Sequence, residues 1–264
     1  MPSPSDPAIA ALPNLRDVGG HATADGGRVR TGLLFRSMDL GRLDADGADA
    51  LARLGLRAVF DLRTVAERDA SPDRLPAGAA YVPLDVLGDA PGSGPEALKG
   101  MLSDPADAER LLGGGRADRF FEDRYREFVS LPSAQAAFGT LLRSLADGAY
   151  RPALFHCTTG KDRTGWAAAM LLLLLGVRHE DVLADYLESN THVLPAFAPI
   201  VEAFAARGGD QALLWPLLEV RPAYLRAGLD EVDRRYGSIE RYVADGLGLD
   251  AGARAALRAA LVAD

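Results

Sequence analysis

The sequence predicts an α/β fold in which a central sheet is flanked by helices, with extra helices in the C-terminal part. Short apolar segments bounded by Gly, Pro or charged residues alternate with helical patterns as far as residue 161, and from residue 162 onward nearly every segment has a helical pattern. The 264 residues are 48% hydrophobic and 25% charged, which suits a sizeable core and excludes a disordered or fibrous chain. Because no repeat, charge block or low-complexity tract divides the chain, we expect one domain over residues 1–264.

Four short apolar runs have the composition of strands, at residues 33–36, 58–62, 79–86 and 153–156. A helix is predicted between the first two, over residues 44–54, with Asp44 as its cap and Gly55 as its stop. Residues 88–100 are rich in Gly and Pro and are expected to form a loop. Two further helices are expected at 104–115 and 117–129.

The second half of the chain is predicted to be helical almost throughout. We expect helices at 163–175, 180–189, 195–206, 211–218, 223–236, 238–246 and 251–262. This surplus is either a plain scaffold or, in part, a mobile cover over a site, and periodicity does not choose between the two.

Charge and composition exclude several classes of partner. Lys and Arg number 29 against 37 Asp and Glu, so the net charge of −8 disfavours nucleic-acid binding, and an anionic substrate would need a local cluster of cations. The single cysteine, Cys157, excludes a disulfide framework, and the four histidines lack metal-ligand spacing, so we expect no metal and no other cofactor. Residues 1–13 lack the pattern of a signal peptide, and the longest apolar run, 166–175, is about half the ~20 residues that span a bilayer. We therefore expect no transmembrane segment and a cytoplasmic location.

The segment HCTTGKDRTG, residues 156–165, joins a buried strand to an apolar helix and is predicted to bind phosphate. A loop that ends at a helix N-terminus presents unpaired N–H groups, and the helix dipole adds partial positive charge. Cys157 lies at the start of this loop, where the same donors favour the thiolate and make it a nucleophile. Arg163 follows six positions later, so the loop can curl once around an anion that the planar guanidinium chelates.

The other loop residues have distinct expected roles. Thr164 supplies a hydroxyl that can hydrogen-bond the sulfur, Gly160 permits a tight backbone, and Lys161 adds a second cation at the rim. A lone cysteine after a strand is more often a small core residue, but the Cys-x5-Arg-Thr spacing between strand and helix favours the functional thiolate. His156 is either an orienting residue for the loop or a buried structural histidine; as a general base it would point to the wrong face.

This segment is similar to the HCxxGKDRTG signature of the protein tyrosine phosphatase superfamily, and specifically of its atypical bacterial group. Other segments resemble blocks of that group in the same order: NLRDVGG at 14–20, GLLFRS at 32–37, FDLRT at 60–64, DYLESN at 185–190, RPAYL at 221–225 and YGS at 236–238. The resemblance covers nearly the whole chain, and the Cys/Arg loop is its most specific part.

The resemblance implies a phosphatase-like central sheet, a cysteinyl-phosphate intermediate, no metal, and a helical lid, which would lie within residues 190–235. Cys157 would be the nucleophile and Arg163 the phosphate clamp, and the amides of Thr158, Thr159, Gly160, Lys161, Asp162 and Arg163 would bind the phosphoryl oxygens. The loop lysine is associated in the family with phosphoinositides as well as phosphotyrosine. We therefore expect phosphotyrosine proteins as substrates, with phosphoserine, phosphothreonine and phosphoinositides as further ones. Members of the family can also be exported without a recognisable signal.

Expulsion of the leaving oxygen requires a general acid. Asp85, which follows YVPL at the end of a predicted strand, is the first candidate, although its alignment with the family's Pro-x-x-Asp region requires one residue to be skipped. Asp162 is the second candidate, with an alternative role in shaping the loop, and Asp61 and Asp89 remain open. Each of the four could instead be a helix cap or a salt-bridge partner.

Three arginines in the resembling blocks, Arg16, Arg36 and Arg63, are candidates for lining the pocket. Arg63 is the first of them, either meeting phosphate or holding Asp61.

The leading hypothesis is a cysteine-dependent phosphatase. The alternatives are a non-catalytic module that binds phosphorylated ligands and a cysteine hydrolase or sulfur transferase. An arginine six residues after the cysteine has no role in acyl transfer, which disfavours the last of these.

Overall fold

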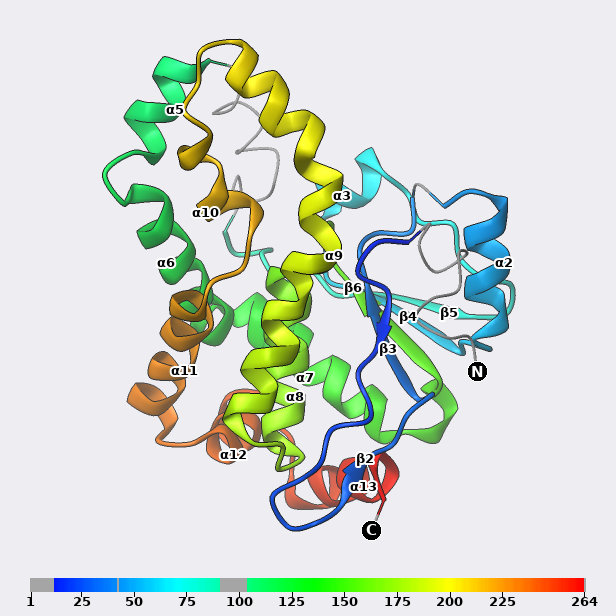
Figure 1. Cartoon of the computed structure of the whole chain (residues 1–264). Coiled ribbons are helices and arrows are strands. Elements are labelled where there is room, and N and C mark those ends of the chain that lie inside the picture. The colour runs from blue at the N-terminus through cyan, green and yellow to red at the C-terminus, as the bar shows by residue number, and fades with distance from the viewer. Residues whose placement is uncertain (1–11, 42, 91–103, 264) are drawn as a thin grey trace.

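The computed structural model describes residues 12–41, 43–90 and 104–263, and it confirms the α/β prediction. Its central sheet has the strand order β1-β3-β6-β4-β5 (Figure 1). The short β1 (Arg16–Asp17) is antiparallel to β3 (Leu34–Ser37), whereas β3, β6 (Ala153–His156), β4 (Ala58–Asp61) and β5 (Ala80–Pro83) are all parallel. The carboxyl ends of the four parallel strands therefore meet at one edge, where α/β proteins place their sites.

Side chains alternate across the sheet between two hydrophobic clusters. On β6, Ala153 and Phe155 belong to the larger cluster, which includes most of the helices, and Leu154 belongs to the smaller one. The smaller cluster also includes Leu51 of α2 (Ala45–Arg53), which begins after its Asp44 cap as predicted. Because both faces of β6 are buried, its carboxyl end is a rigid support for the residues that follow.

The other helices cover the second face and both ends of the sheet. They are α3 (Val65–Ala70), α5 (Pro105–Leu112), α6 (Arg116–Ser130), α7 (Pro132–Ala146), α8 (Asp162–Leu174), α9 (His179–Ala206), α10 (Trp215–Leu218), α11 (Pro222–Tyr236), α12 (Ile239–Arg241) and α13 (Ala251–Leu261). Two 3₁₀ turns, Gly148–Tyr150 and Gln211–Leu213, and a π-helical turn, Tyr242–Gly246, complete the helical segments among the described residues. A separate two-stranded ladder pairs β2 (Arg28–Val29) with β7 (Val262–Ala263).

Several predicted boundaries in the helical half are wrong. The helices expected at 180–189 and 195–206 are one continuous helix, α9, with Pro195 and Pro199 inside it. Each proline removes a main-chain N–H donor, but the continuous helix buries Val193, Val201 and Phe204, and this apolar contact favours its continuation. The segment 211–218 instead divides into a 3₁₀ turn and α10, and 238–246 divides into α12 and the π-helical turn.

Some elements have no counterpart in the predictions. They are the helices α3 and α7 and the short strands β1, β2 and β7. Residues 91–100 of the expected loop, and residues 1–11 of the segment examined for a signal peptide, lie outside the described residues.

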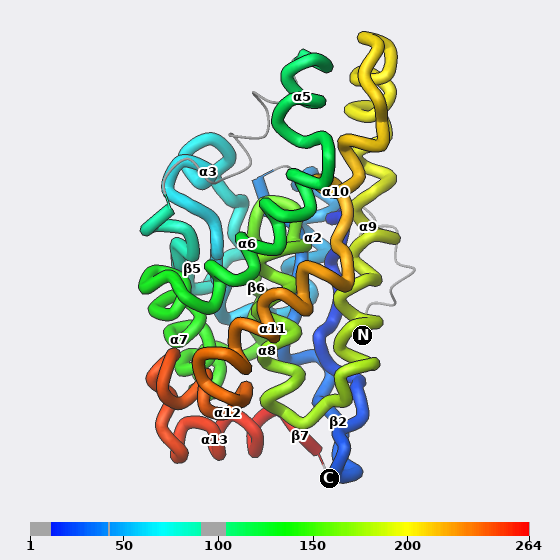
Figure 2. Tube along the Cα trace, turned by 90° about the vertical axis from the view of Figure 1, so that its left-hand side faces the viewer, coloured from blue at the N-terminus to red at the C-terminus, as the bar shows by residue number. Residues whose placement is uncertain are grey.

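A group of helices extends beyond the sheet. In both views α5 and the C-terminal end of α9 rise above the rest of the molecule, and α10 lies below them (Figures 1 and 2). Among the described residues, no helix has both the length and the apolar character needed to cross a membrane.

Candidate active site

The predicted anion-binding loop lies between β6 and α8, at the carboxyl edge of the sheet. Cys157 directly follows β6 and is 2% exposed. Within the described part of the chain, none of the main-chain N–H groups of residues 158–163 donates to a protein acceptor. Six consecutive amides beside a buried cysteine, with α8 beginning at Asp162, form the unpaired donor set that an anion requires.

Gly160 is required by the shape of this loop. Its φ is +67°, in the left-handed region, and a Cβ at this position would lie 2.2 Å from the carbonyl oxygen of Ser37. The Gly160 carbonyl accepts hydrogen bonds from Nδ2 of Asn14 (2.8 Å) and from Nη2 of Arg36 (2.9 Å). The middle of the loop is therefore held by Arg36 on β3 and by Asn14, just before β1.

Arg163 has its guanidinium fixed by one carboxylate. Its Nη1 and Nη2 donate to the two carboxylate oxygens of Glu67, at 2.7 and 2.6 Å, and Nη1 also donates to the carbonyl of Leu62 at 3.2 Å. Among the described residues, the Nε–H and the outer Nη2–H have no acceptor. These two N–H groups lie on one edge of the planar guanidinium and form a fork that matches two phosphoryl oxygens.

Glu67 is a site residue that the sequence analysis missed. It also accepts hydrogen bonds from the Thr158 hydroxyl of the loop and from the main chain and hydroxyl of Thr64. Burial raises the pKa of this carboxyl, but the Arg163 charge and the hydrogen bonds outweigh it and lower the pKa to about 2. The detectable signal was the pairing of Thr64 with Glu67 as a capping box at the start of α3, although it predicts a helix rather than a contact with Arg163.

Thr164 lies at the start of α8 with a buried hydroxyl. Its Oγ1 has no hydrogen-bond partner among the described residues, which is uncommon for a buried polar atom. Thr158 and Thr159 are half-buried in the loop. The Thr164 hydroxyl is thus available to a group that enters the loop.

Arg16 and Arg36 lie behind the loop. Arg36 is fully buried, and its guanidinium contacts Asp185 of α9 at 3.0 Å and the Ser189 hydroxyl at 3.2 Å. Arg16 reaches the same Asp185 at 3.3 Å. Burial raises the pKa of Asp185, but the charges of Arg36 and Arg16 outweigh it and the pKa is lowered. Arg36, which also bonds to the Gly160 carbonyl, therefore connects the loop to α9.

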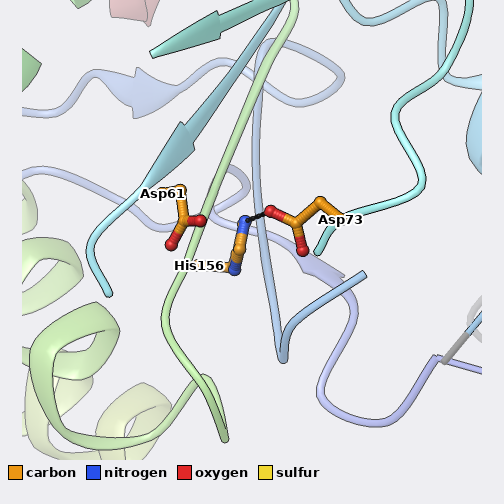
Figure 3. A group of neighbouring side chains, drawn as sticks. All are labelled: Asp61, Asp73 and His156. Atoms are coloured by element: carbon orange, nitrogen blue, oxygen red, sulfur yellow. Dashed lines mark ion pairs between the residues drawn. The ribbon is translucent and has the colours of Figure 1, made fainter. Parts of the chain in front are cut away.

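A second group of buried charges surrounds His156, the residue that precedes Cys157 (Figure 3). The carboxylates of Asp61 and Asp73, together with the imidazole, form the one cluster with metal-ligand composition among the described residues. However, Nη2 of Arg63 lies 2.8 Å from Asp61 and 2.9 Å from Asp73. A metal ion there would lie against a guanidinium, so we assign the cluster to charge pairing.

Arg63 is 1% exposed and points into this cluster. Its Nε and Nη2 donate to both oxygens of Asp61, and its Nη1 donates to the carbonyl of Ser71. Of the two roles left open for Arg63, the structure shows the contact with Asp61. Burial raises the pKa of Asp61, but hydrogen bonds from Arg63 and the His156 charge outweigh it and hold the pKa well below its usual range. Asp61 therefore holds no proton to donate at neutral pH.

The remaining candidates for the general acid lie in different surroundings. Asp85 is half-buried in the loop after β5, and its carboxylate accepts the main-chain N–H of Val65 at the start of α3, at 3.3 Å. Asp89 is exposed and accepts the main-chain N–H of Ser133 on α7, at 2.6 Å. Asp162 accepts the Tyr125 hydroxyl at 3.2 Å. Only Asp85 contacts the helix that carries Glu67 while its side chain remains partly open.

Lys161 is buried beneath the helices that rise above the sheet. Its Nζ donates to the carbonyls of Leu217 (2.6 Å) and Glu219 (3.2 Å) at the C-terminal end of α10. It also lies 3.4 Å from the Asp162 carboxylate and 5.1 Å from the ring centre of Phe121. The ammonium predicted at the rim thus contacts the segment that covers the loop.

Comparisons with known proteins agree with this geometry. The tyrosine phosphatase family matches residues 7–263. The triple specificity protein phosphatase PtpB of Mycobacterium tuberculosis is 36% identical over 267 residues, covering 90% of this chain and 94% of that protein. A protein of Cupriavidus necator, provisionally named a tyrosine-protein phosphatase, is 36% identical over 93% of this chain and 85% of its own length. A tyrosine-protein phosphatase of Nostoc commune is 32% identical over 67% of this chain and 54% of its own length.

Proposed function

The chain belongs to the tyrosine phosphatase family, and from that premise we propose that it hydrolyses phosphate monoesters through a covalent intermediate on Cys157. The run of unpaired amides at residues 158–163 is the observation that carries this proposal. The free edge of the Arg163 guanidinium supplies a matching fork of donors. Together these donors would stabilise the charge that develops on the transferring phosphoryl group.

In the first step, the Cys157 thiolate attacks phosphorus and forms an S–P bond while the bond to the leaving oxygen breaks. The leaving phenolate or alkoxide takes a proton from a carboxylic acid. Asp85 is our candidate for this acid, because it is partly open and contacts the N-terminal turn of α3. Asp162 is the second candidate, and its contacts with Tyr125 and Lys161 favour the alternative role in shaping the loop.

In the second step, water attacks phosphorus, the S–P bond breaks, and phosphate leaves. The carboxylate formed in the first step takes the proton from that water, and the cysteine returns as a thiolate. The Thr164 hydroxyl, which is buried without a partner, would donate a hydrogen bond to the departing sulfur. No step requires a metal or another cofactor.

We propose phosphotyrosine proteins as the main substrates, with phosphoserine, phosphothreonine and phosphoinositides as further ones. One relative is named a triple specificity protein phosphatase, which supports a range wider than one phosphorylated residue. Lys161 is the candidate for contact with a second phosphate, but its ammonium is now bonded to the Leu217 and Glu219 carbonyls. Such a substrate would have to replace these carbonyls.

We also propose that the chain is one phosphatase domain with a lid. The segment with the Leu217 and Glu219 carbonyls lies within residues 190–235, where a lid was expected, and it contacts the loop through Lys161. The expected cytoplasmic location stays a prediction, as does export without a signal. Fractionation of cells and culture medium distinguishes the two.

Phosphate release tests the proposed function. Purified wild-type protein and Cys157→Ser are compared, under the same metal-free conditions, on a phosphotyrosine peptide, a phosphoserine peptide and a monophosphorylated phosphoinositide. We expect release by the wild type and none by Cys157→Ser, which should still bind the peptide. Binding without release by the wild type would instead identify a non-catalytic binding module. Equal release by both proteins would refute the role of Cys157.

A further inference from the structure

The imidazole of His156 lies between two oxygen atoms that face its two ring nitrogens. Nδ1 is 3.1 Å from the carbonyl oxygen of Cys157. Nε2 is 3.0 Å from Oδ2 of Asp73, the contact that Figure 3 marks with a dashed line. A neutral imidazole has one N–H donor and one lone pair. One of the two contacts would then set a nitrogen lone pair against an oxygen, so the ring that fits both contacts carries a proton on each nitrogen.

The contact between His156 and Asp73 depends on charge more than on alignment. Nε2 and Oδ2 are both buried, and although they are 3.0 Å apart they do not form a well-aligned hydrogen bond. Such a contact is favourable when the ring is a cation facing an anion. The charge also acts on the neighbouring strand, where His156 stands opposite Asp61 in register and contributes to the low pKa of that carboxyl.

Asp73 is held in place independently of His156. It lies in the connection between α3 and β5, and its other oxygen, Oδ1, accepts the main-chain N–H of Leu40 at 2.9 Å. The neighbouring Arg74 N–H bonds back to the Leu40 carbonyl at 3.3 Å. Arg63 contacts Oδ2 as well. The Asp73 carboxylate is therefore held in place and can orient the His156 imidazole.

From this arrangement we propose that Asp73 is a positioning residue for the nucleophile. By pairing with Nε2 of His156, it keeps the ring doubly protonated and turned so that Nδ1–H donates to the Cys157 carbonyl. This fixes the first residue of the anion loop and places a positive charge behind the sulfur. The role rests on the proposed function of Cys157 and concerns a residue that belongs to neither the loop nor its flanking helix.

Other charged groups act on the His156 ring and on the Cys157 sulfur, so the test needs a control for their effects. The Asp61 carboxylate acts on His156 as Asp73 does, and Arg63 pairs with both carboxylates. The Cys157 sulfur is also within the influence of the Arg163 and Arg36 charges. A variant that changes Asp73 alone must therefore be compared with one that removes an equivalent charge elsewhere in the cluster.

Alkylation of Cys157 by iodoacetamide measures the thiolate directly, because Cys157 is the one cysteine of the chain. We compare the pH dependence of the alkylation rate for wild type, Asp73→Asn, Asp73→Glu and Asp39→Asn. Asp39 is the matched control: it is buried and lies 3.8 Å from Arg63, and its carboxylate bonds to Ser71 and Gly41 rather than to His156.

We expect Asp73→Asn to move the midpoint of the alkylation profile to higher pH by about one unit. At pH values below the midpoint, the thiolate fraction of Cys157 would then be roughly tenfold lower. Asp73→Glu, which keeps the charge, should restore part of the shift, and Asp39→Asn should leave the midpoint in place. In a His156→Asn background, Asp73→Asn should add no further shift. A midpoint unchanged in Asp73→Asn, or a full further shift without the histidine, would overturn the proposal.

A second measurement requires no substitution of Asp73. In wild-type protein with isotope-labelled histidine, NMR at neutral pH should show both ring nitrogens of His156 protonated, with His156→Asn used for assignment. A neutral ring would overturn the proposal even if Asp73→Asn fails to fold. Neither readout requires turnover: a shifted midpoint without phosphate release would refute the proposed function alone, and release with an unchanged midpoint would refute the role of Asp73 alone.

Discussion

The back of the anion loop and the segment that covers its front are held by different kinds of contact. Behind the loop, buried polar and charged side chains from several elements bond to it, with Asn14 and Arg36 at the Gly160 carbonyl and Glu67 at Arg163. At the front, the C-terminal end of α10 contacts the loop through the ammonium of Lys161. Among the described residues, the loop is thus fixed from behind by several buried side chains, whereas α10 reaches it from the front through Lys161.

This difference follows from the energetics of the two contacts. A buried charge that loses its partner is strongly destabilised, so the charges behind the loop hold one another in a single arrangement. The Lys161 ammonium bonds to neutral carbonyls of the covering segment and also pairs with Asp162 at 3.4 Å, so it keeps a charged partner when water or a phosphate replaces those carbonyls.

Arg163→Lys should lower kcat/KM for a phosphotyrosine peptide roughly a hundredfold or more, because an ammonium cannot form the planar fork or the paired bonds to Glu67. Steady-state kinetics measures the effect, with Arg234→Lys on the exposed side of α11 as the control. A loss of less than tenfold would show that the guanidinium geometry is not what the loop requires.

Gly160→Ala tests the rigidity of the loop itself. The added Cβ would meet the Ser37 carbonyl at 2.2 Å, so we expect a loss of folding stability of about 3 kcal/mol together with loss of activity. Gly237→Ala is the matched control, since its φ of +81° carries the same backbone strain with no atom within 4 Å of the new Cβ. It should cost only about 1 kcal/mol. Equal losses in denaturant unfolding would mean that the contact with Ser37 is unimportant.

Glu67→Gln should remove a pH-dependent part of the stability. The pKa of Glu67 is about 2 in the folded protein, below the ordinary value of 4.5, so its contribution is complete above about pH 4.5 and is lost as the pH falls towards 2. From that shift we expect a stability deficit of about 3 kcal/mol for the variant at neutral pH. The deficit should shrink on acidification, as measured by urea unfolding at several pH values. A deficit that stays constant from neutral pH to about pH 2 would contradict the assignment.

Lys161→Met should have the smallest effect on turnover and a clear effect on the segment that covers the loop, residues 207–221. Without its bonds to Leu217 and Glu219, residues 207–221 should exchange amide hydrogens several-fold faster, while turnover of a phosphotyrosine peptide changes little. Arg126→Met, on the exposed side of α6, is the control. If exchange in this segment is unaffected, the apolar contacts alone hold the cover closed.

The parts of the site that are local in sequence could be predicted, and those that are assembled by the fold could not. Cys157, Arg163 and the loop between them form one continuous segment, so their proximity follows from their spacing alone. Glu67 is separated from Arg163 by 96 residues, and no pattern in a single sequence joins them. The same holds for Asp185, which is 149 residues from Arg36.

The fold shows the same division. The strand at 153–156 was predicted to the residue, because apolar runs before a turn are a local signal. The continuity of α9 through Pro195 and Pro199 was missed, because the two prolines signal a break and the apolar contacts that override them come from the tertiary structure. The role of Arg63 was left open for a similar reason: its charge suits phosphate, and only the fold brings Asp61 and Asp73 to it.

The most direct test of the central claim is to trap the intermediate. Wild-type protein is mixed with a phosphotyrosine peptide, quenched in acid within the first turnover, digested, and examined by mass spectrometry. We predict a phosphoryl group on the peptide that contains Cys157, and none in Cys157→Ser treated in the same way. Phosphate release with no phosphorylated Cys157 at any quench time, or a phosphoryl group on another residue, would contradict it.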